Sequence, residues 1–295
     1  MSILFVFVDG VGLAPAGPDN PLSTLPTPAL AAVLGGALTL ERVQRRPLVA
    51  LVPLDATLGV PGLPQSATGQ TALLTGVNGA ALLGFHATAY PGPRLRAVIA
   101  EHGLLGLAVA AGRRVAFANP YTPGTVAQLR SGERRASATT SAALAAGLPL
   151  RGVDELLAGR AVTWDVCRDH FAERLGRSLP TVSPAEAGLH LAALAADHDL
   201  TLYETFYTDL AAHGRFGLRV EDAVARLDGL LGGALAALPP AATLVLSSDH
   251  GNLEDATQRL HTRNPVPLLA VGPVAPAFSG LTSILDVTPA ILAAL

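Results

Sequence analysis

Short apolar runs in this sequence repeatedly end beside an aspartate or a histidine. Residues 3–8 are wholly apolar and are followed at once by Asp9, and residues 243–246 are followed closely by Asp249 and His250. Apolar runs of this length are typical of parallel strands that are buried on both faces. Since such strands alternate here with helical segments, we expect an α/β fold with a doubly wound, mostly parallel sheet.

Other segments extend this alternation. Residues 47–52, 200–206 and 267–271 predict further strands. Residues 68–75 predict a helix that ends at a Gly-Val-Asn stop, and residues 219–238 have the spacing of an amphipathic helix. The sequence therefore predicts strands and helices in the order of an α/β core.

The middle of the chain differs in composition from its two ends. Residues 81–195 contain most of the arginines, several Gly/Pro breaks and one strand candidate at 114–118. We therefore expect two domains. Residues 1–80 and 196–295 would form a metal-binding catalytic core, and residues 81–195 a smaller inserted α/β cap that contacts substrate.

Composition narrows the possible partners. The net charge is −3, all 20 basic residues are arginine, and the only cysteine is Cys167. This balance does not predict a nucleic-acid surface, and the single cysteine excludes an intramolecular disulfide and a thiolate metal cluster. No apolar run approaches the ~20 residues that span a bilayer. We expect a cytoplasmic protein that contacts anionic ligands through arginine, and the sequence leaves its oligomeric state open.

Polar residues that follow the predicted strands form a candidate metal centre. In open α/β sheets, ligands bind outside the carboxyl ends of the strands. Three aspartates, three histidines and one hydroxyl are expected there: Asp9, Ser66, Asp209, His213, Asp249, His250 and His261. Carboxylates and imidazoles suit manganese or zinc. Seven ligands exceed the needs of one tetrahedral ion, so the set predicts two divalent ions with open positions.

Ser66 is the candidate nucleophile. It lies just before the predicted helix start, where backbone N–H groups can face a phosphate. The sequence has no Gly-x-Ser-x-Gly motif, so a metal ion rather than a histidine base is expected to activate this hydroxyl. Thr68 is the second candidate.

At this point the sequence resembles the alkaline phosphatase superfamily. The matching segments are Asp9-Gly, Ser66-Ala-Thr-Gly, Asp209-x-x-x-His213, Asp249-His250-Gly-Asn and His261-Thr-Arg-Asn-Pro-Val-Pro, in that order. The resemblance is greatest to the branch of cofactor-independent phosphoglycerate mutases and phosphopentomutases. It covers roughly residues 1–78 and 200–295.

The resemblance implies roles for these residues. Ser66 is expected to become transiently phosphorylated beside two ions. The ligands implied for the first ion are Asp9, Ser66, Asp249 and His250. Those implied for the second are Asp209, His213 and His261. Gln70 stands where the mutases have a histidine, and the chain has no lysine to lie near the transferring phosphate. The substrate therefore remains open.

Several functions fit these motifs. The first is a phosphomutase or phosphatase that acts on a small phosphorylated metabolite. The alternatives are a phosphodiesterase or sulfatase of the same fold, and a catalytically silent metal-binding protein. His86, Arg94 and Arg263 are candidates for substrate contact, although histidines and arginines at such positions are more often ordinary surface residues.

Overall fold

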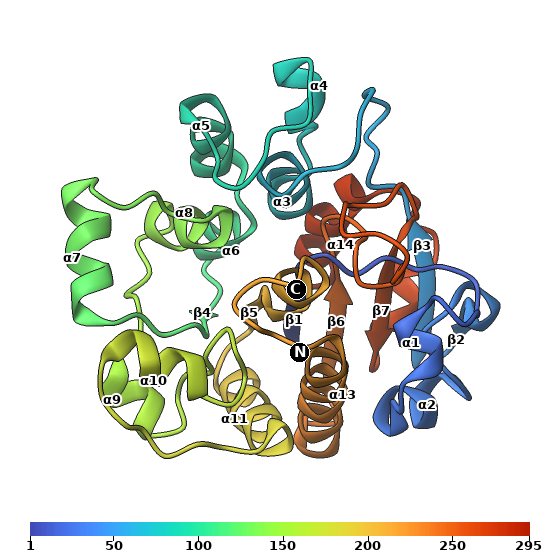
Figure 1. Ribbon diagram of the computed structural model, residues 1–295. Coiled ribbons are helices and arrows are strands. Elements are labelled where there is room, and N and C mark those ends of the chain that lie inside the picture. The colour runs from blue at the N-terminus through green and yellow to red at the C-terminus, as the bar shows by residue number, and fades with distance from the viewer.

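The centre of the molecule is a seven-stranded sheet with the order β2-β3-β7-β6-β1-β5-β4 (Figure 1). The structure is a computed structural model that describes residues 1–295, apart from the side chain of Arg130. The strands are β1 (Ser2–Val8), β2 (Gln44–Arg46), β3 (Val49–Leu54), β4 (Val115–Phe117), β5 (Leu200–Thr205), β6 (Ala242–Ser247) and β7 (Val266–Val271).

The middle of the sheet is parallel and one edge is antiparallel. Strands β6, β1, β5 and β4 run parallel to one another, whereas β7, β3 and β2 join by antiparallel pairing. The expected doubly wound, mostly parallel α/β sheet is confirmed. The chain returns from β6 to β7 without a crossover helix, so these two strands must be antiparallel.

Helices cover both faces of the sheet, and each face has its own apolar core (Figure 1). One face is covered by α3 (Ser66–Thr75), α5 (Pro93–His102), α6 (Leu104–Ala110), α8 (Ala138–Ala145) and α14 (Val287–Ala294). The other is covered by α1 (Pro21–Thr24), α2 (Pro28–Leu34), α11 (Pro184–Asp197) and α13 (Val220–Ala237).

Strand β1 shows how the sequence divides between these two cores. Phe5 and Phe7 face the α3 side, whereas Val6 and Val8 face the α13 side. All four side chains are fully buried because helices cover both faces, which explains the uninterrupted apolar run. Among the described residues, every helix is too short or too polar to cross a membrane.

The middle segment, residues 81–195, is part of this sheet as well as an extension of it. Strand β4, expected within a separate cap, pairs with β5 and places Val115 beside Leu200. This strand of the expected cap segment therefore belongs to the main sheet, where the side chain of Phe117 is part of the main core. The bounds 1–80, 81–195 and 196–295 stay a prediction.

The rest of the segment extends beyond the sheet edge. Its helices are α4 (Gly79–Leu83), α7 (Pro123–Ser131), α9 (Val153–Leu157) and α10 (Asp169–Leu175). The α9–α10 region has a small apolar cluster of its own, around Leu156 and Phe171. In Figure 1 the green and yellow-green helices α7, α9 and α10 lie on the β4 side of the sheet, whereas α4 lies above α3.

Candidate metal centre

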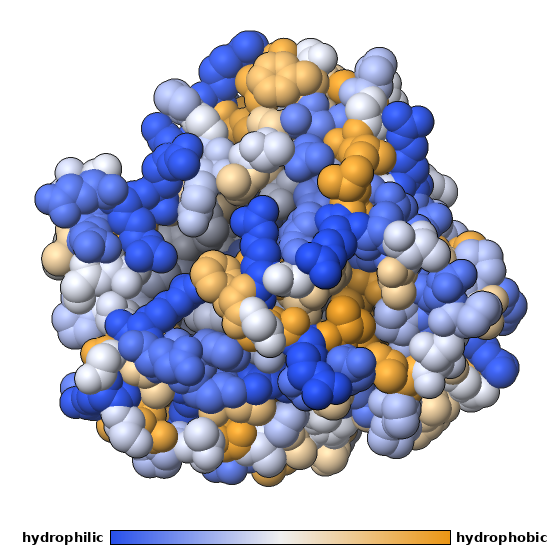
Figure 2. All heavy atoms as spheres, in the orientation of Figure 1, coloured by the Kyte–Doolittle hydropathy of each residue, from blue (hydrophilic) through white to orange (hydrophobic). Residues whose placement is uncertain are grey.

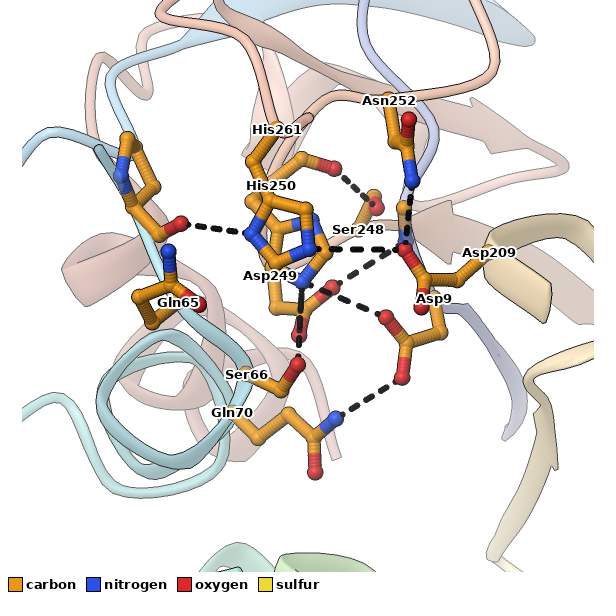
Figure 3. A network of polar contacts seen from close by, with 12 residues as sticks. Asp9, Gln65, Ser66, Gln70, Asp209, Ser248, Asp249, His250, Asn252 and His261 are labelled. Atoms are coloured by element: carbon orange, nitrogen blue, oxygen red, sulfur yellow. Dashed lines mark hydrogen bonds and ion pairs between the residues drawn. The ribbon is translucent and has the colours of Figure 1, made fainter. Parts of the chain in front are cut away.

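The predicted ligands meet at the carboxyl edge of the sheet (Figure 3). Asp9 directly follows β1, and Asp249 lies just past the end of β6. Asp209 is carried by the short helix α12 (Tyr207–Ala212), which follows β5. Strands β6, β1 and β5 are neighbours in the sheet, so residues far apart in the chain are brought together.

A first group of side chains surrounds one nitrogen of His250. Its Nε2 lies 3.4 Å from Asp9 Oδ1 and 3.4 Å from Asp249 Oδ2. The hydroxyl of Ser66 lies 3.1 Å from the same nitrogen. Ligand atoms of Asp9, Asp249 and His250 all lie within 4.8 Å of one another, which suits one metal ion.

A second group surrounds Asp209. Its Oδ1 lies 3.3 Å from His213 Nε2 and 3.6 Å from His261 Nε2. The two Nε2 atoms are 3.2 Å apart. His250 also comes within reach, since ligand atoms of Asp209, His250 and His261 lie within 4.8 Å of one another. All seven predicted ligands therefore belong to two adjoining groups.

Backbone carbonyls fix which nitrogen two of the histidines present. His213 Nδ1 donates to the carbonyl oxygen of Arg259 at 2.7 Å, and His261 Nδ1 donates to that of Pro64 at 2.8 Å. A carbonyl can only accept, so Nδ1 carries the proton and Nε2 is turned toward Asp209. This arrangement is common for histidines that bind metal.

The electrostatics of the site are those of crowded, buried acids. Burial, followed by the charge of Asp209, raises the pKa of Asp249 to about 8. Burial, followed by the charges of Asp249 and Asp209, raises the pKa of Asp9 well above its ordinary value. Burial acts to raise the pKa of Asp209 too, but hydrogen bonds from His213 and Asn252 lower it to about 2. Burial lowers the pKa of His250 to about 3, so its ring is neutral.

The donor set fits a pair of divalent ions. Within the described part of the chain, Asp9 Oδ1 and Asp249 Oδ2 are buried oxygens without a hydrogen-bond partner. Burying unpaired carboxylate oxygens is costly, and a bound cation would satisfy them. The surrounding imidazoles and the Ser66 hydroxyl complete a donor set that suits divalent metal ions.

Glu254 supports the site, although little in the sequence indicates its role. Its carboxylate accepts hydrogen bonds from the backbone N–H of Gly12 and of Asn252, each at 2.8 Å. It also accepts from the hydroxyl of Thr262 and from the amide of Asn264, at 3.0 Å. It therefore ties the loop after β1 to the loop that carries His250 and His261. The only available signal was an Asn-Leu-Glu run that begins two residues after His250.

Two amides orient the carboxylates. Asn252 Nδ2 donates to Asp209 Oδ1 at 2.9 Å. Gln70 Nε2 donates to Asp9 Oδ2 at 3.0 Å, which leaves Oδ1 turned toward His250. Gln70, where the resembling mutases have histidine, is thus a positioning residue for Asp9 here.

The nucleophile candidate begins helix α3, which approaches the end of β6 closely. A Cβ at Gly69 would lie 2.6 Å from the carbonyl oxygen of Asp249, so only glycine permits this contact. Thr68 is fully buried and donates its hydroxyl to the carbonyl of Gln65. Ser66, rather than Thr68, therefore presents its hydroxyl to the ligands.

The three candidate substrate residues lie in different places. His86 and Arg94 line a hollow between α4 and α5, and His86 Nε2 contacts the carbonyl oxygen of Val60 at 3.2 Å. Arg263 is exposed, two residues after His261. The structure does not bring these three side chains together, and their contact with substrate stays a prediction.

Comparisons with known proteins agree with this geometry. Residues 185–295 match the model of the Metalloenzyme superfamily, and that span contains five of the seven predicted ligands. None of the curated proteins is similar to the chain in sequence.

Solved structures share the fold along almost the whole chain. The PH0037 protein of Pyrococcus horikoshii has a TM-score of 0.53 and 14% identity, with 99% of this chain and 96% of that chain covered. The cold-active alkaline phosphatase of the psychrophile Shewanella sp. has a TM-score of 0.51 and 14% identity, with 100% of both chains covered. The protein Ps i-CgsB has a TM-score of 0.52 and 14% identity, with 99% and 71% covered.

The family match covers residues 185–295 only, and the solved structures, at 14% identity, are similar to this chain in fold. The finer resemblance to the mutase branch stays a prediction.

Proposed function

We propose that the chain is a two-metal phosphoryl-transfer enzyme, a phosphomutase or phosphatase that acts on a small phosphorylated metabolite through phosphorylated Ser66. One observation carries this proposal. The Ser66 hydroxyl lies 3.1 Å from His250 Nε2, within the first group of candidate ligands. A hydroxyl that only capped a helix would not need to lie beside a buried histidine nitrogen that also contacts Asp9 and Asp249.

The chain's own residues provide for attack on a phosphate ester. Ser66 begins the ten-residue helix α3, in which the backbone N–H of Ala67 donates to the carbonyl of Ala87, so those of Ser66 and Thr68 are the candidate donors to phosphate oxygens. Ser66 Oγ forms the new bond to phosphorus, and the ester oxygen departs and takes up a proton. Divalent ions, manganese or zinc, would lower the pKa of this hydroxyl and neutralise phosphate charge when bound by the seven ligands.

Mutase and phosphatase differ in what accepts the phosphoryl group from Ser66. A mutase returns it to another hydroxyl of the same substrate, and a phosphatase transfers it to water. Exclusion of water during the second half of the reaction favours the mutase outcome. Product analysis in ¹⁸O-labelled water separates the two, because only hydrolysis incorporates the label.

The proposal is tested by intact-mass measurement of the metal-loaded protein after exposure to a panel of sugar phosphates. We expect a covalent phosphoryl adduct that maps to Ser66, and elemental analysis should give two metal ions per chain. Ser66→Ala should lose the adduct and the activity but keep the metals. The control is Thr68→Val, which removes the neighbouring buried hydroxyl and should retain both.

The alternatives have distinct outcomes in the same experiment. Turnover of an aryl diester or an aryl sulfate, with none on monoesters, would indicate a phosphodiesterase or a sulfatase. Protein that holds two ions but never carries the adduct or turns over any ester would be a silent metal-binding protein. Full activity of Ser66→Ala would contradict the proposed nucleophile.

A further inference from the structure

A pocket outside the metal centre is lined by arginines and aromatic rings. It has a volume of about 530 Å³ and opens where β4 and β5 end. The residues that matter here are Tyr90, Arg134, Arg135, Trp164, Arg174 and Glu204. Figure 2 shows this face hollowed near α7 and α8, with hydrophilic side chains around the opening. Its volume falls within the ~300–1,000 Å³ of typical small-molecule sites.

The pocket adjoins the metal centre. Glu204, on its wall, pairs in the sheet with Phe7, two residues before Asp9. The backbone N–H of Asp9 donates to the carbonyl of Thr205, the residue after Glu204. Strands rise about 3.3 Å per residue, so the wall lies within roughly 10 Å of the Asp9 backbone. The wall of the pocket and the metal centre are therefore neighbours at the same edge of the sheet.

The arginines are held by aromatic rings rather than by acids. Arg174 lies over the ring of Trp164, 4.7 Å from its centroid, and Arg135 lies over Tyr90 at 5.0 Å. Phe206 stacks on Trp164 at 4.5 Å between ring centroids. The aromatic residues thus position guanidinium groups through cation–π contact and leave their N–H groups available.

These charges are not neutralised by the protein. Throughout the described residues, Arg134, Arg135 and Arg174 form no ion pair with a carboxylate, whereas Arg226, near α10, is paired with Asp169 at 2.5 Å. Three cationic side chains around one pocket repel each other, so an anionic occupant is favoured. The planar guanidinium group suits carboxylate and phosphate oxygens.

We propose that this pocket binds a second anionic group of the substrate, so that the enzyme acts on phosphorylated sugars that carry a further carboxylate or phosphate. The inference rests on the proposed function of the metal centre. The transferred phosphate lies at Ser66, the sugar extends past Glu204, and the second anion meets Arg134 and Arg174. Hydroxyls on the sugar face the polar wall formed by Glu204 and its neighbours.

Binding measurements on an inactive variant test the proposed role of the pocket without turnover of the ligand. Metal-loaded Ser66→Ala protein is titrated with glucose 6-phosphate, glucose 1,6-bisphosphate and 6-phosphogluconate, with calorimetry for affinity. Trp164 is the only tryptophan in the chain, so its fluorescence reports events in the pocket. We expect the latter two ligands to bind roughly tenfold or more tightly than glucose 6-phosphate and to change the fluorescence. The better of the two identifies the second anion as phosphate or carboxylate.

Arginine variants test whether the tighter binding of ligands with a second anionic group depends on this pocket. Arg134→Gln and Arg174→Gln should each remove most of the preference for the second anion and leave binding of glucose 6-phosphate unchanged. Arg177→Gln is the matched control, since Arg177 is an exposed arginine just past α10 and outside the pocket. Equal affinity for all three ligands, or the same loss in Arg177→Gln, would overturn the proposal.

Failure of this inference is distinguishable from failure of the proposed function. If the wild-type protein forms phospho-Ser66 but shows no preference for a second anion, the proposed function is supported and the proposed role of the pocket is excluded. If binding of a second anion depends on Arg134 and Arg174 but Ser66 is never phosphorylated, the role of the pocket is supported and the transfer reaction is excluded.

Discussion

The imidazole rings of His250 and His261 stack face to face, with centroids 3.7 Å apart and planes inclined by 16°. His250 has its Nε2 near Asp9 and Asp249, whereas His261 has its Nε2 near Asp209. The two candidate ion sites are therefore in direct contact through their histidines. A substitution at one site should therefore alter metal binding at the other.

We expect His261→Ala to reduce the metal content from two ions per chain to one. The remaining ion would be held by Asp9, Asp249 and His250, which keep their positions. Elemental analysis after gel filtration measures the ratio. His198→Ala is a suitable control, because among the described residues His198 bonds only to the carbonyl of Leu194 in α11. An unchanged content of two ions in His261→Ala would contradict the assignment of the second site.

Glu254→Gln should weaken metal binding without replacing a ligand. The change turns one of the accepting oxygens into a donor, which faces N–H groups of Gly12 and Asn252. Outer-shell changes of this kind typically cost 10–100-fold in metal affinity. Competition with a chromophoric chelator measures the dissociation constants, and circular dichroism checks the fold. Affinity within a factor of two of the wild type would show that Glu254 does not hold the ligand loops.

Two helical glycines should respond in opposite ways to alanine. Gly69→Ala forces a Cβ against the Asp249 carbonyl, so we expect a loss of about 2 kcal/mol or more in unfolding free energy. Gly106→Ala, in α6, meets open space and should gain up to about 1 kcal/mol. Urea denaturation of both variants measures the difference. Similar stability of the two would mean that α3 can move away from β6.

Glu204 should make the metal-free protein less stable as the pH rises. Burial raises the pKa of this carboxyl to about 7, above its ordinary value. Between about pH 4.5 and 7 the folded state keeps a proton that the unfolded state has lost, so the unfolding free energy falls with increasing pH. Glu204→Gln, which can still accept from Thr139, should remove this slope and be on the order of 2–3 kcal/mol more stable than the wild type at pH 8.

The quantity to compare is the difference in unfolding free energy between the wild type and Glu204→Gln, because the other titrating groups are the same in both proteins. Thermal or urea unfolding at pH 5 and pH 8, in the presence of a chelator, gives the values. A difference that stays constant over this range would show that Glu204 titrates normally in the folded protein.

The parts of the site that were predictable from sequence are those set by strand ends. An apolar run that stops at Asp9 or near Asp249 identifies a buried parallel strand, and the fold rule for parallel sheets then brings such ends together. The end of helix α3 was predictable from its glycine-containing stop, and its start at Ser66 lies two residues before the expected one. These inferences need only local patterns and one general rule.

What could not be predicted depends on contacts between distant residues. Nothing local to residues 115–117 tells whether β4 forms a separate sheet or extends the main one, because both choices bury the same side chains. The role of Glu254 is similar, since its partners at Gly12 and Thr262 are set by loop packing. The arginine pocket is assembled from α10 and the loop between α7 and α8, which no sequence spacing connects.

The central place of β1 has a consequence for how the protein is made. Its two neighbours, β5 and β6, begin at Leu200 and Ala242, so both edges of β1 stay unpaired while about 200 residues are translated. An apolar strand with two free edges is a template for association between nascent chains. Productive folding therefore waits until most of the polypeptide has left the ribosome, and chains released early should aggregate rather than accumulate as a stable fragment.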